Sequence, residues 1–241
     1  MIQTRIIAHR GNSSRYHENT MPAFQQAVED GADGIEFDVR LTRDRQWVVH
    51  HDAEVVTEGG ARLISIMTLD EIREAHVGPH RDPIPTLAEF LEWSNQAGTP
   101  AIFDIKDTDG MPELIETVER AQPTRPPVYS SFHRSVLKQI EHFRPQWQRG
   151  LIVGDPKFAI ARRFLIGSIL RWSRRHRITS LHLAERWIHP SLISEIQNAG
   201  VRVAVWTVDD PVRITLLAAL GVDGIITNCP DRARAALRGN Q

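Results

Sequence analysis

Short apolar segments alternate with longer amphipathic segments along the whole chain. Each short segment is rich in Ile, Val, Leu, Ala or Phe and has the length of a buried strand. We expect strands over residues 5–8, 34–39, 101–105, 127–130, 150–153, 179–183, 201–206 and 223–226. We expect a helix after each strand, over residues 20–30, 87–95, 112–121, 134–142, 158–175, 190–199, 211–220 and 231–237.

Strict alternation of strands and helices predicts a parallel sheet that is covered by helices. Eight such units in 241 residues match the usual size of a (β/α)8 barrel. An open doubly wound sheet is the competing fold, but it normally carries a glycine-rich phosphate-binding turn after its first strand. The first turn here reads AHRGNSS and has one glycine. The pattern therefore favours a (β/α)8 TIM barrel, formed by one domain over residues 1–241.

The alternation is interrupted once, between Asp38 and Leu87. This stretch contains WVVHHD, a Gly59-Gly60 pair and LDEIREA. We expect a short strand ending at His51, a loop, and a short helix over residues 69–75, so that roughly residues 52–85 form an insertion after the second strand. Long loops inside domains are often functional, and this one lies on the side where barrel enzymes carry their active sites.

Polar residues gather where the predicted strands end. In a barrel the C-terminal ends of the strands form the active-site mouth, and strand residues two apart share a face. The residues that would meet there are His9 and Arg10, Glu36 and Asp38, Asp104 and Lys106, and Trp206. The sequence thus predicts a mouth with three carboxylates, two cationic groups and a histidine.

This set of side chains is typical of a metal-assisted reaction on an anion. Three carboxylates in one place repel each other, and a hard divalent cation such as Mg²⁺ or Ca²⁺ would neutralise them through oxygen ligands. The cluster has no cysteine, which argues against a structural zinc site. Arg10 and Lys106 would hold an anion such as a phosphate, and a histidine would transfer protons. Taken singly, each residue also fits an ordinary structural role, and strand alternation does not decide whether His50 or His51 faces the mouth.

Composition and charge narrow the classes of partner. The net charge of −1 gives no indication of nucleic-acid binding. Cys229 is the single cysteine, so no internal disulfide is expected. The sequence has neither the apolar stretch of a signal peptide nor a transmembrane run. We therefore expect a cytoplasmic location.

Residues 157–177 combine arginines with large apolar side chains. Phe164, Leu165, Ile169 and Trp172 follow helical spacing and would form one face, together with Phe158, Ala161 and Ser168. One interpretation is an outer barrel helix that packs this face on the strands. The other is a helix that makes peripheral contact with an anionic membrane, because the apolar residues Ile166 and Leu170 lie off the main face.

Several spaced motifs resemble the glycerophosphodiester phosphodiesterase family over nearly the whole chain. In sequence order they are AHRG, HENTMPAF, GADGIEFDVRLTRDRQWVVHHD, IPTLAEFL, FDIK, SSF and VAVWTVDD…GVDGIITNCP. The resemblance implies a (β/α)8 barrel with a small insertion after the second strand. It also implies hydrolysis of glycerophosphodiesters to glycerol 3-phosphate and an alcohol, with the help of one divalent cation.

The resemblance also implies roles for individual residues. His9 and His51 match the catalytic acid/base pair. Residues expected to bind the substrate are Arg10 and Lys106 at the phosphate, Glu18 at the mouth, and Trp206 against the glycerol. Residues expected to hold the cation, with Mg²⁺ preferred over Ca²⁺, are Glu36, Asp38 and Asp104.

The chain departs from the family pattern at three places. Asp104 stands where a glutamate ligand is more usual, AEVVTEGG follows Asp52 where the family often has Arg-Thr, and Asn228 stands where aspartate is common. Two other functions also fit the sequence. One is the same chemistry on membrane lysophospholipids, as a lysophospholipase D, and the other is a barrel that binds a phosphorylated ligand without turning it over.

Overall fold

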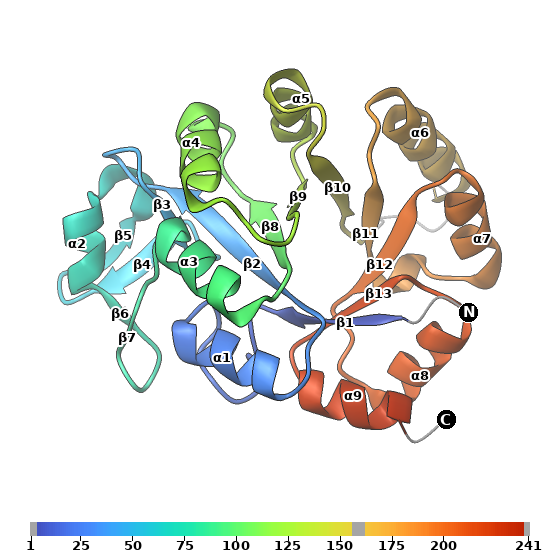
Figure 1. The fold of residues 1–241 in the computed structure, drawn as a ribbon, viewed down its shortest axis with the longest axis horizontal. Helices are drawn as coiled ribbons and strands as arrows, with labels where there is room; N and C mark the ends of the chain where they lie inside the picture. The colour runs from blue at the N-terminus through green and yellow to red at the C-terminus, as the bar shows by residue number, and fades with distance from the viewer. Residues whose placement is uncertain (1–3, 156–161, 239–241) are drawn as a thin grey trace.

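A closed barrel of parallel strands forms the centre of the computed structural model, which describes residues 4–155 and 162–238 (Figure 1). Eight strands follow one another around it, and the last pairs with the first. In spatial order they are β1 Arg5–His9, β2 Gly34–Leu41, β8 Ala101–Ile105, β9 Val128–Ser131, β10 Gln148–Val153, β11 Ser180–Ala184, β12 Arg202–Trp206 and β13 Gly224–Thr227. The predicted (β/α)8 barrel is confirmed.

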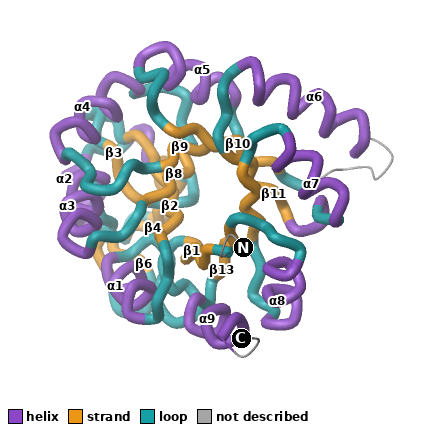
Figure 2. The backbone as a smooth tube through the Cα atoms, turned by 45° about the vertical axis from the view of Figure 1, so that its right-hand side comes forward, coloured by secondary structure: helices purple, strands orange, loops and turns teal. Residues whose placement is uncertain are grey.

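Helices surround the ring of strands (Figure 2). They are α1 Met21–Glu29, α3 Leu87–Ala97, α4 Met111–Ala121, α5 Arg134–Phe143, α6 Arg162–Arg175, α7 Pro190–Asn198, α8 Pro211–Ala219 and α9 Pro230–Arg238, with a short 3-10 helix η3 at Glu185–Trp187. N-terminal capping side chains stabilise the first turn of several of these helices. Thr86 and Glu89 form a capping box at α3, and Asp210 accepts two backbone amides at α8. Observed and predicted bounds differ by at most two residues, apart from the start of α6, where residues 158–161 lie outside the described residues.

Helix α6 buries a face that overlaps the predicted one in part. Its buried residues are Ile166, Ile169, Leu170 and Ser173, whereas Leu165 is 43% exposed. Ile166 and Leu170 had suggested membrane contact, but they pack in the main core between helices and strands. Of the expected face, Ile169 is buried and Trp172 packs against the core, Leu165 and Ser168 are exposed, and Phe158, Ala161 and the side chain of Phe164 lie outside the described part of the structure. Spacing alone does not fix the rotation of a helix that is apolar on more than one side. No helix within residues 4–155 and 162–238 has the length and apolarity needed to cross a membrane.

Residues 47–83 form a small unit of their own beside the barrel. Strand β3 Trp47–Val49 pairs antiparallel with β2. Beyond it lie the hairpins β4 Glu54–Thr57 with β5 Gly60–Leu63, and β6 His76–Val77 with β7 Asp82–Pro83, together with the 3-10 helix η1 Ile64–Ile66 and helix α2 Leu69–Glu74. The short helix was predicted within one residue, but the expected loop before it is a hairpin. The signal for that hairpin was present, because Gly59-Gly60 follows a β-branched pair of valines.

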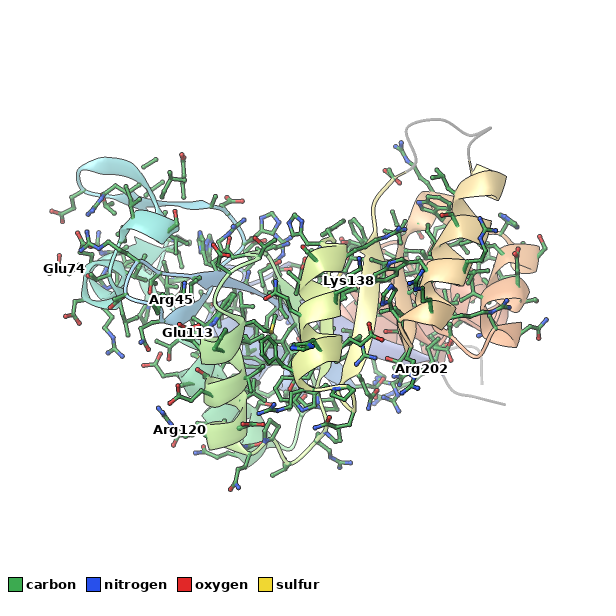
Figure 3. All side chains as sticks on the ribbon, turned by 90° about the horizontal axis from the view of Figure 1, so that it is seen from above. Arg45, Glu74, Glu113, Arg120, Lys138 and Arg202 are labelled. Carbon is green, nitrogen blue, oxygen red and sulfur yellow. The ribbon has the colours of Figure 1, made fainter. Side chains whose placement is uncertain are left out.

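This unit has its own apolar core and is held to the barrel at its base. Val55, Ile64, Met67 and Ile72 are buried together with Val48 of β3; the remaining members of this cluster are Ala75 and Ile84. In the turn between β2 and β3, the Arg45 guanidinium donates two hydrogen bonds to Glu113 of α4, at 2.7 and 2.9 Å (Figure 3). Trp47 also donates from its indole nitrogen to the Gly110 carbonyl, 3.1 Å away. These contacts fix the strand that leads to His51.

An aromatic cluster supports β2 on its outer face. Phe37 alternates with Glu36 and Asp38 along the strand and therefore points away from the barrel interior. Its ring packs 3.9 Å from that of Phe90 and 4.9 Å from that of Phe103, measured between ring centroids. Phe24 of α1 stands edge-on to Phe90 at 4.9 Å. This packing holds in place the strand that carries two of the predicted metal ligands.

Removing the Phe90 ring tests how much this cluster contributes to stability. Phe90 is fully buried, so Phe90→Ala leaves a cavity and is expected to lower the free energy of unfolding by about 3–5 kcal/mol. Urea unfolding followed by tryptophan fluorescence measures it. The matched control is Val212→Ala at a residue 75% exposed, which should change stability by less than about 0.5 kcal/mol. Equal effects of the two changes would contradict the assigned packing.

Candidate active site

A pocket opens among the side chains at the C-terminal ends of the strands. It encloses about 430 Å³ of empty space, part of which is open to solvent. One half of its lining is charged or titratable, and consists of His9, Arg10, Glu36, His51, Asp104 and Lys106. The other half is mostly apolar, and consists of Phe132, Ile152, His182, Trp206 and Ile226. The charged half of the pocket is therefore suited to an anion, and the apolar half to the carbon atoms of a ligand.

Three buried carboxylates converge in the charged half. Asp38 and Asp104 lie side by side because the register of β2 and β8 pairs them, and Glu36 is one pleat earlier on β2. One oxygen from each carboxylate lies within 4.8 Å of the others. Glu36 Oε2 and Asp104 Oδ1 are buried and make no hydrogen bond within the described residues, whereas Asp38 Oδ1 is met by the Lys106 ammonium at 2.8 Å. Buried oxygens without donors are what a cation would coordinate.

Two cationic side chains balance part of this negative charge. Lys106 Nζ lies 2.6 Å from Asp104 Oδ2 and 2.8 Å from Asp38 Oδ1. Arg10 Nε lies 2.9 Å from Asp38 Oδ2. Burial opposes the ionisation of Asp38, but the charges of Lys106 and Arg10 outweigh it and lower its pKa. Burial and the neighbouring Asp38 and Asp104 charges hold the pKa of Glu36 well above its ordinary value.

Asn19 fixes the orientation of the Asp38 carboxylate. Its side-chain nitrogen donates to Asp38 Oδ2 at 2.8 Å, and its side-chain oxygen accepts from the Asp38 backbone nitrogen at 3.3 Å. The backbone of Asn19 is left-handed, with φ of 58°, a conformation that asparagine adopts more readily than most residues. Asn19 stands in the HENT motif, next to Glu18, and had not been predicted as a site residue.

His9 is held by a chain of hydrogen bonds from β13. Its Nδ1 lies 2.7 Å from Asn228 Oδ1. The Asn228 side-chain nitrogen donates to Asp209 Oδ2 at 2.7 Å, and its backbone nitrogen donates to Asp209 Oδ1 at 2.7 Å. This leaves His9 Nε2 turned toward the carboxylates, 4.0 Å from Glu36 Oε2. Burial and, next, the charge of Arg10 lower the pKa of His9, which favours the neutral ring.

Of the adjacent histidines His50 and His51, only His51 lines the pocket. His51 lines the pocket, and its Nδ1 lies 2.8 Å from Asp52 Oδ1. Its backbone carbonyl accepts a hydrogen bond of 2.7 Å from Arg40 Nε. His50 instead pairs with the Glu54 carbonyl at 3.2 Å, and burial lowers its pKa. His51 therefore faces the same pocket as His9.

Two further predicted residues lie at the rim and on the apolar wall. Glu18 Oε1 accepts from Arg10 Nη1 at 2.8 Å, so Glu18 acts on the pocket through that guanidinium. Trp206 packs edge-on against Phe132, with ring centroids 5.8 Å apart. Lys106 Nζ lies 5.7 Å from the centroid of the Phe132 ring. The aromatic pair thus joins the apolar half of the pocket to its charged half.

The structure brings all nine predicted site residues to one mouth. Seven line the pocket, while Asp38 lies beneath it and Glu18 beside Arg10. The predictions omitted Asn19, Asp209 and Phe132, and offered no account of Asn228. Phe132 stands in the SSF motif, and Asp209 follows Trp206 in WTVDD. Their roles come from contacts across the barrel, which spacing within one strand does not reveal.

Comparisons with known proteins agree with this geometry. The sequence model of the glycerophosphoryl diester phosphodiesterase family matches residues 9–232. A glycerophosphodiester phosphodiesterase of Caldanaerobacter subterraneus is 32% identical, with 95% of this chain and 96% of the relative covered. One from Bacillus altitudinis is 29% identical, with coverage of 95% and 96%.

Solved structures give the same fold. A phosphodiesterase of Oleispira antarctica, in complex with the product sn-glycerol-3-phosphate, has a TM-score of 0.86 at 24% identity, with 98% of this chain and 97% of that chain covered. A glycerophosphodiester phosphodiesterase of Parabacteroides distasonis has a TM-score of 0.84 at 25% identity, with coverage of 99% and 98%. From the family match, the relatives and the shared barrel, we conclude that this chain belongs to the glycerophosphoryl diester phosphodiesterase family and is a phosphoric diester hydrolase.

Proposed function

We propose that the protein hydrolyses small glycerophosphodiesters to glycerol 3-phosphate and an alcohol, with one divalent cation and a pair of histidines. The observation that carries the proposal is the set of three buried carboxylates, of which Glu36 and Asp104 each have an oxygen without a donor, beside the pocket that His9 and His51 line. The comparisons support the diesterase activity. The cation and the roles of individual residues are inferred from the geometry.

Glu36, Asp38 and Asp104 would hold the cation. These three carboxylates and Glu18 share two cationic side chains, Arg10 and Lys106, so negative groups are in excess in a largely buried place. A divalent cation would offset this excess and favour the ionised form of Glu36, whose pKa is raised by burial and by the neighbouring Asp38 and Asp104 charges. All-oxygen ligands suit Mg²⁺ or Ca²⁺, and we propose Mg²⁺ first. When bound, the cation would polarise a phosphoryl oxygen.

The two histidines have different hydrogen-bond partners, and this suggests different roles. His9 is buried, with a lowered pKa, and its Nδ1 partner is the neutral amide of Asn228, so His9 suits the general base. His51 pairs with Asp52, whose pKa is lowered by that hydrogen bond. That hydrogen bond holds the His51 ring through Nδ1, and with His9 as the base the role of general acid falls to His51.

The proton transfers then follow a simple course. His9 takes a proton at Nε2 from the nucleophile, which is either water or the 2-hydroxyl of the glycerol itself; the latter gives a cyclic phosphate that water opens. His51 gives a proton to the oxygen of the departing alcohol as the bond from phosphorus to that oxygen breaks. Arg10 and Lys106 lie close enough to the carboxylates to neutralise charge that develops on the phosphoryl oxygens.

The pocket walls favour a small diester over a lysophospholipid. Trp206 and Phe132 offer an aromatic surface for the carbons of glycerol, and the Oleispira relative of the same fold was solved with sn-glycerol-3-phosphate. The lysophospholipase D alternative drew on apolar residues of α6 at a membrane. Two of them, Ile166 and Leu170, are buried in the core; Leu165 is the large apolar side chain that stays exposed among the described residues of α6, and one such residue is a small surface for membrane contact.

Metal removal should abolish the reaction. With glycerophosphocholine as substrate, a chelator is expected to stop hydrolysis, and added Mg²⁺ or Ca²⁺ to restore it. Asp104→Asn should weaken metal binding, measured by calorimetry, by at least about 10–100-fold, the loss seen when only a supporting residue is removed. The control is Glu116→Gln at the exposed Arg120–Glu116 ion pair on α4, outside the pocket. Full activity in chelator would overturn the metal-dependent mechanism.

The division of roles predicts how each histidine variant responds to the leaving group. His51→Gln should slow hydrolysis of glycerophosphocholine by about 10²–10⁴-fold. On the p-nitrophenyl ester of glycerol 3-phosphate, the His51→Gln variant should keep most of the wild-type activity, because nitrophenolate leaves without protonation. His9→Gln should be impaired on both esters. The reverse pattern, measured as kcat/KM on both, would exchange the two roles.

Asn228, the hydrogen-bond partner of His9, should influence the pH at which kcat/KM begins to rise. A general base must be neutral, and the lowered pKa of His9 places the ascending limb of kcat/KM below the usual value of imidazole, about 6.5. Asn228→Asp puts a carboxylate on Nδ1, raises that pKa and should move the limb to higher pH. The control Asn198→Asp adds the same charge at the exposed end of α7 and should leave the profile in place. An unmoved limb in Asn228→Asp argues against His9 as the base.

A further inference from the structure

His182 is a buried polar residue on the far side of the pocket from the carboxylates. It lies on β11, which is four strands from β2 in either direction around the ring. The side chains of β2 and β11 that point inward therefore face each other across the barrel. His182 is 3% exposed and lines the pocket, yet the proton transfers proposed above do not involve it.

The fold makes room for the His182 ring and tethers one of its nitrogens. Nε2 lies 3.1 Å from Ser180 Oγ, two residues earlier on the same strand face. Gly150 of the adjacent strand β10 leaves the space that the ring occupies, since a Cβ there would lie 2.9 Å from Nε2. Nδ1 has no hydrogen-bond partner in the described part of the chain. A neutral imidazole has one donor and one acceptor, so this ring can still make one hydrogen bond.

The surroundings of His182 suit an uncharged polar partner. Its neighbours in that half of the pocket are Ile152, Ile226, Trp206 and Phe132. Burial and, to a smaller extent, the charge of Arg202 lower the pKa of His182 to about 4. The ring is therefore neutral at physiological pH. A neutral ring within apolar walls favours a hydroxyl over a phosphate, whose charge is met on the opposite side by Arg10 and Lys106.

We propose that His182 binds the terminal hydroxyl of the substrate's glycerol group through Nδ1, and so selects glycerol esters over less hydroxylated ones. The inference rests on the proposed function, which places the phosphate between the carboxylates of β2 and β8 and the two cations. The 2-hydroxyl lies next to the ester and remains near the histidines. The terminal hydroxyl is the polar group farthest from phosphorus, and it points toward the wall that carries His182.

A pair of substrates tests the contact directly. The choline ester of propane-1,2-diol phosphate keeps the hydroxyl beside the ester and lacks the terminal one. The wild-type enzyme should prefer glycerophosphocholine to this ester by about 10–100-fold in kcat/KM, because the propanediol ester has no hydroxyl to pair with Nδ1 of His182. His182→Leu should lose that factor on glycerophosphocholine and change by less than about threefold on the propanediol ester. His182→Asn, which keeps a donor and an acceptor, should retain part of the preference.

Other outcomes would overturn the proposal. Equal losses on both substrates would show a purely structural role, and an unchanged preference in His182→Leu would show that the contact is absent. Should His182→Leu fail to fold, as judged by urea unfolding, Ser180→Ala removes the tether and should reduce the preference. Calorimetry of glycerol 3-phosphate against propane-1,2-diol phosphate gives a readout that is independent of turnover. If the wild-type enzyme hydrolyses neither ester, the proposed function fails. The difference in affinity between glycerol 3-phosphate and propane-1,2-diol phosphate would still decide the role of His182.

Discussion

Mutual repulsion among Glu36, Asp38 and Asp104 is the constraint on which the rest of the site depends. Three carboxylates buried within reach of one another are unfavourable unless cations compensate them. Lys106 and Arg10 supply part of that compensation, and both converge on Asp38. The remaining negative charge and the oxygens of Glu36 and Asp104 that lack a donor are what we propose a divalent cation to satisfy. On that proposal, the local cost in stability becomes affinity for the reactants.

The fold tolerates this cost because the charged cluster stands on a rigid base. The parallel register sets Asp38 beside Asp104, and on the other face of β2 the ring of Phe37 is held between Phe90 and Phe103. One strand therefore turns an apolar face to the helices and an acidic face to the pocket. Because interiors pack densely, a shift of the carboxylates away from one another would require the aromatic cluster to move as well.

Sequence reasoning predicted the parts of the molecule that depend on local periodicity. Strand–helix alternation gave the barrel, and the i, i+2 rule placed Glu36 with Asp38 on one face. It did not reach features that depend on contacts between distant segments. The hold of Asn19 on Asp38, the support of His9 by Asn228, and the buried face of α6 each need partners far away in the chain. Strand alternation likewise left open the choice between His50 and His51; the family resemblance pointed to His51, which lines the pocket in the structure.

The two histidines show how one residue type acquires two characters from its neighbours. His9 is buried and bonded to an amide, whereas His51 is more exposed and bonded to a carboxylate. Asn228 thus has a physical explanation where an aspartate is common. The negative charge behind His9 is moved one residue farther away, onto Asp209, which still fixes the amide through two hydrogen bonds. The ring keeps its orientation without a direct carboxylate partner, and this combination suits the role of general base that we propose for His9.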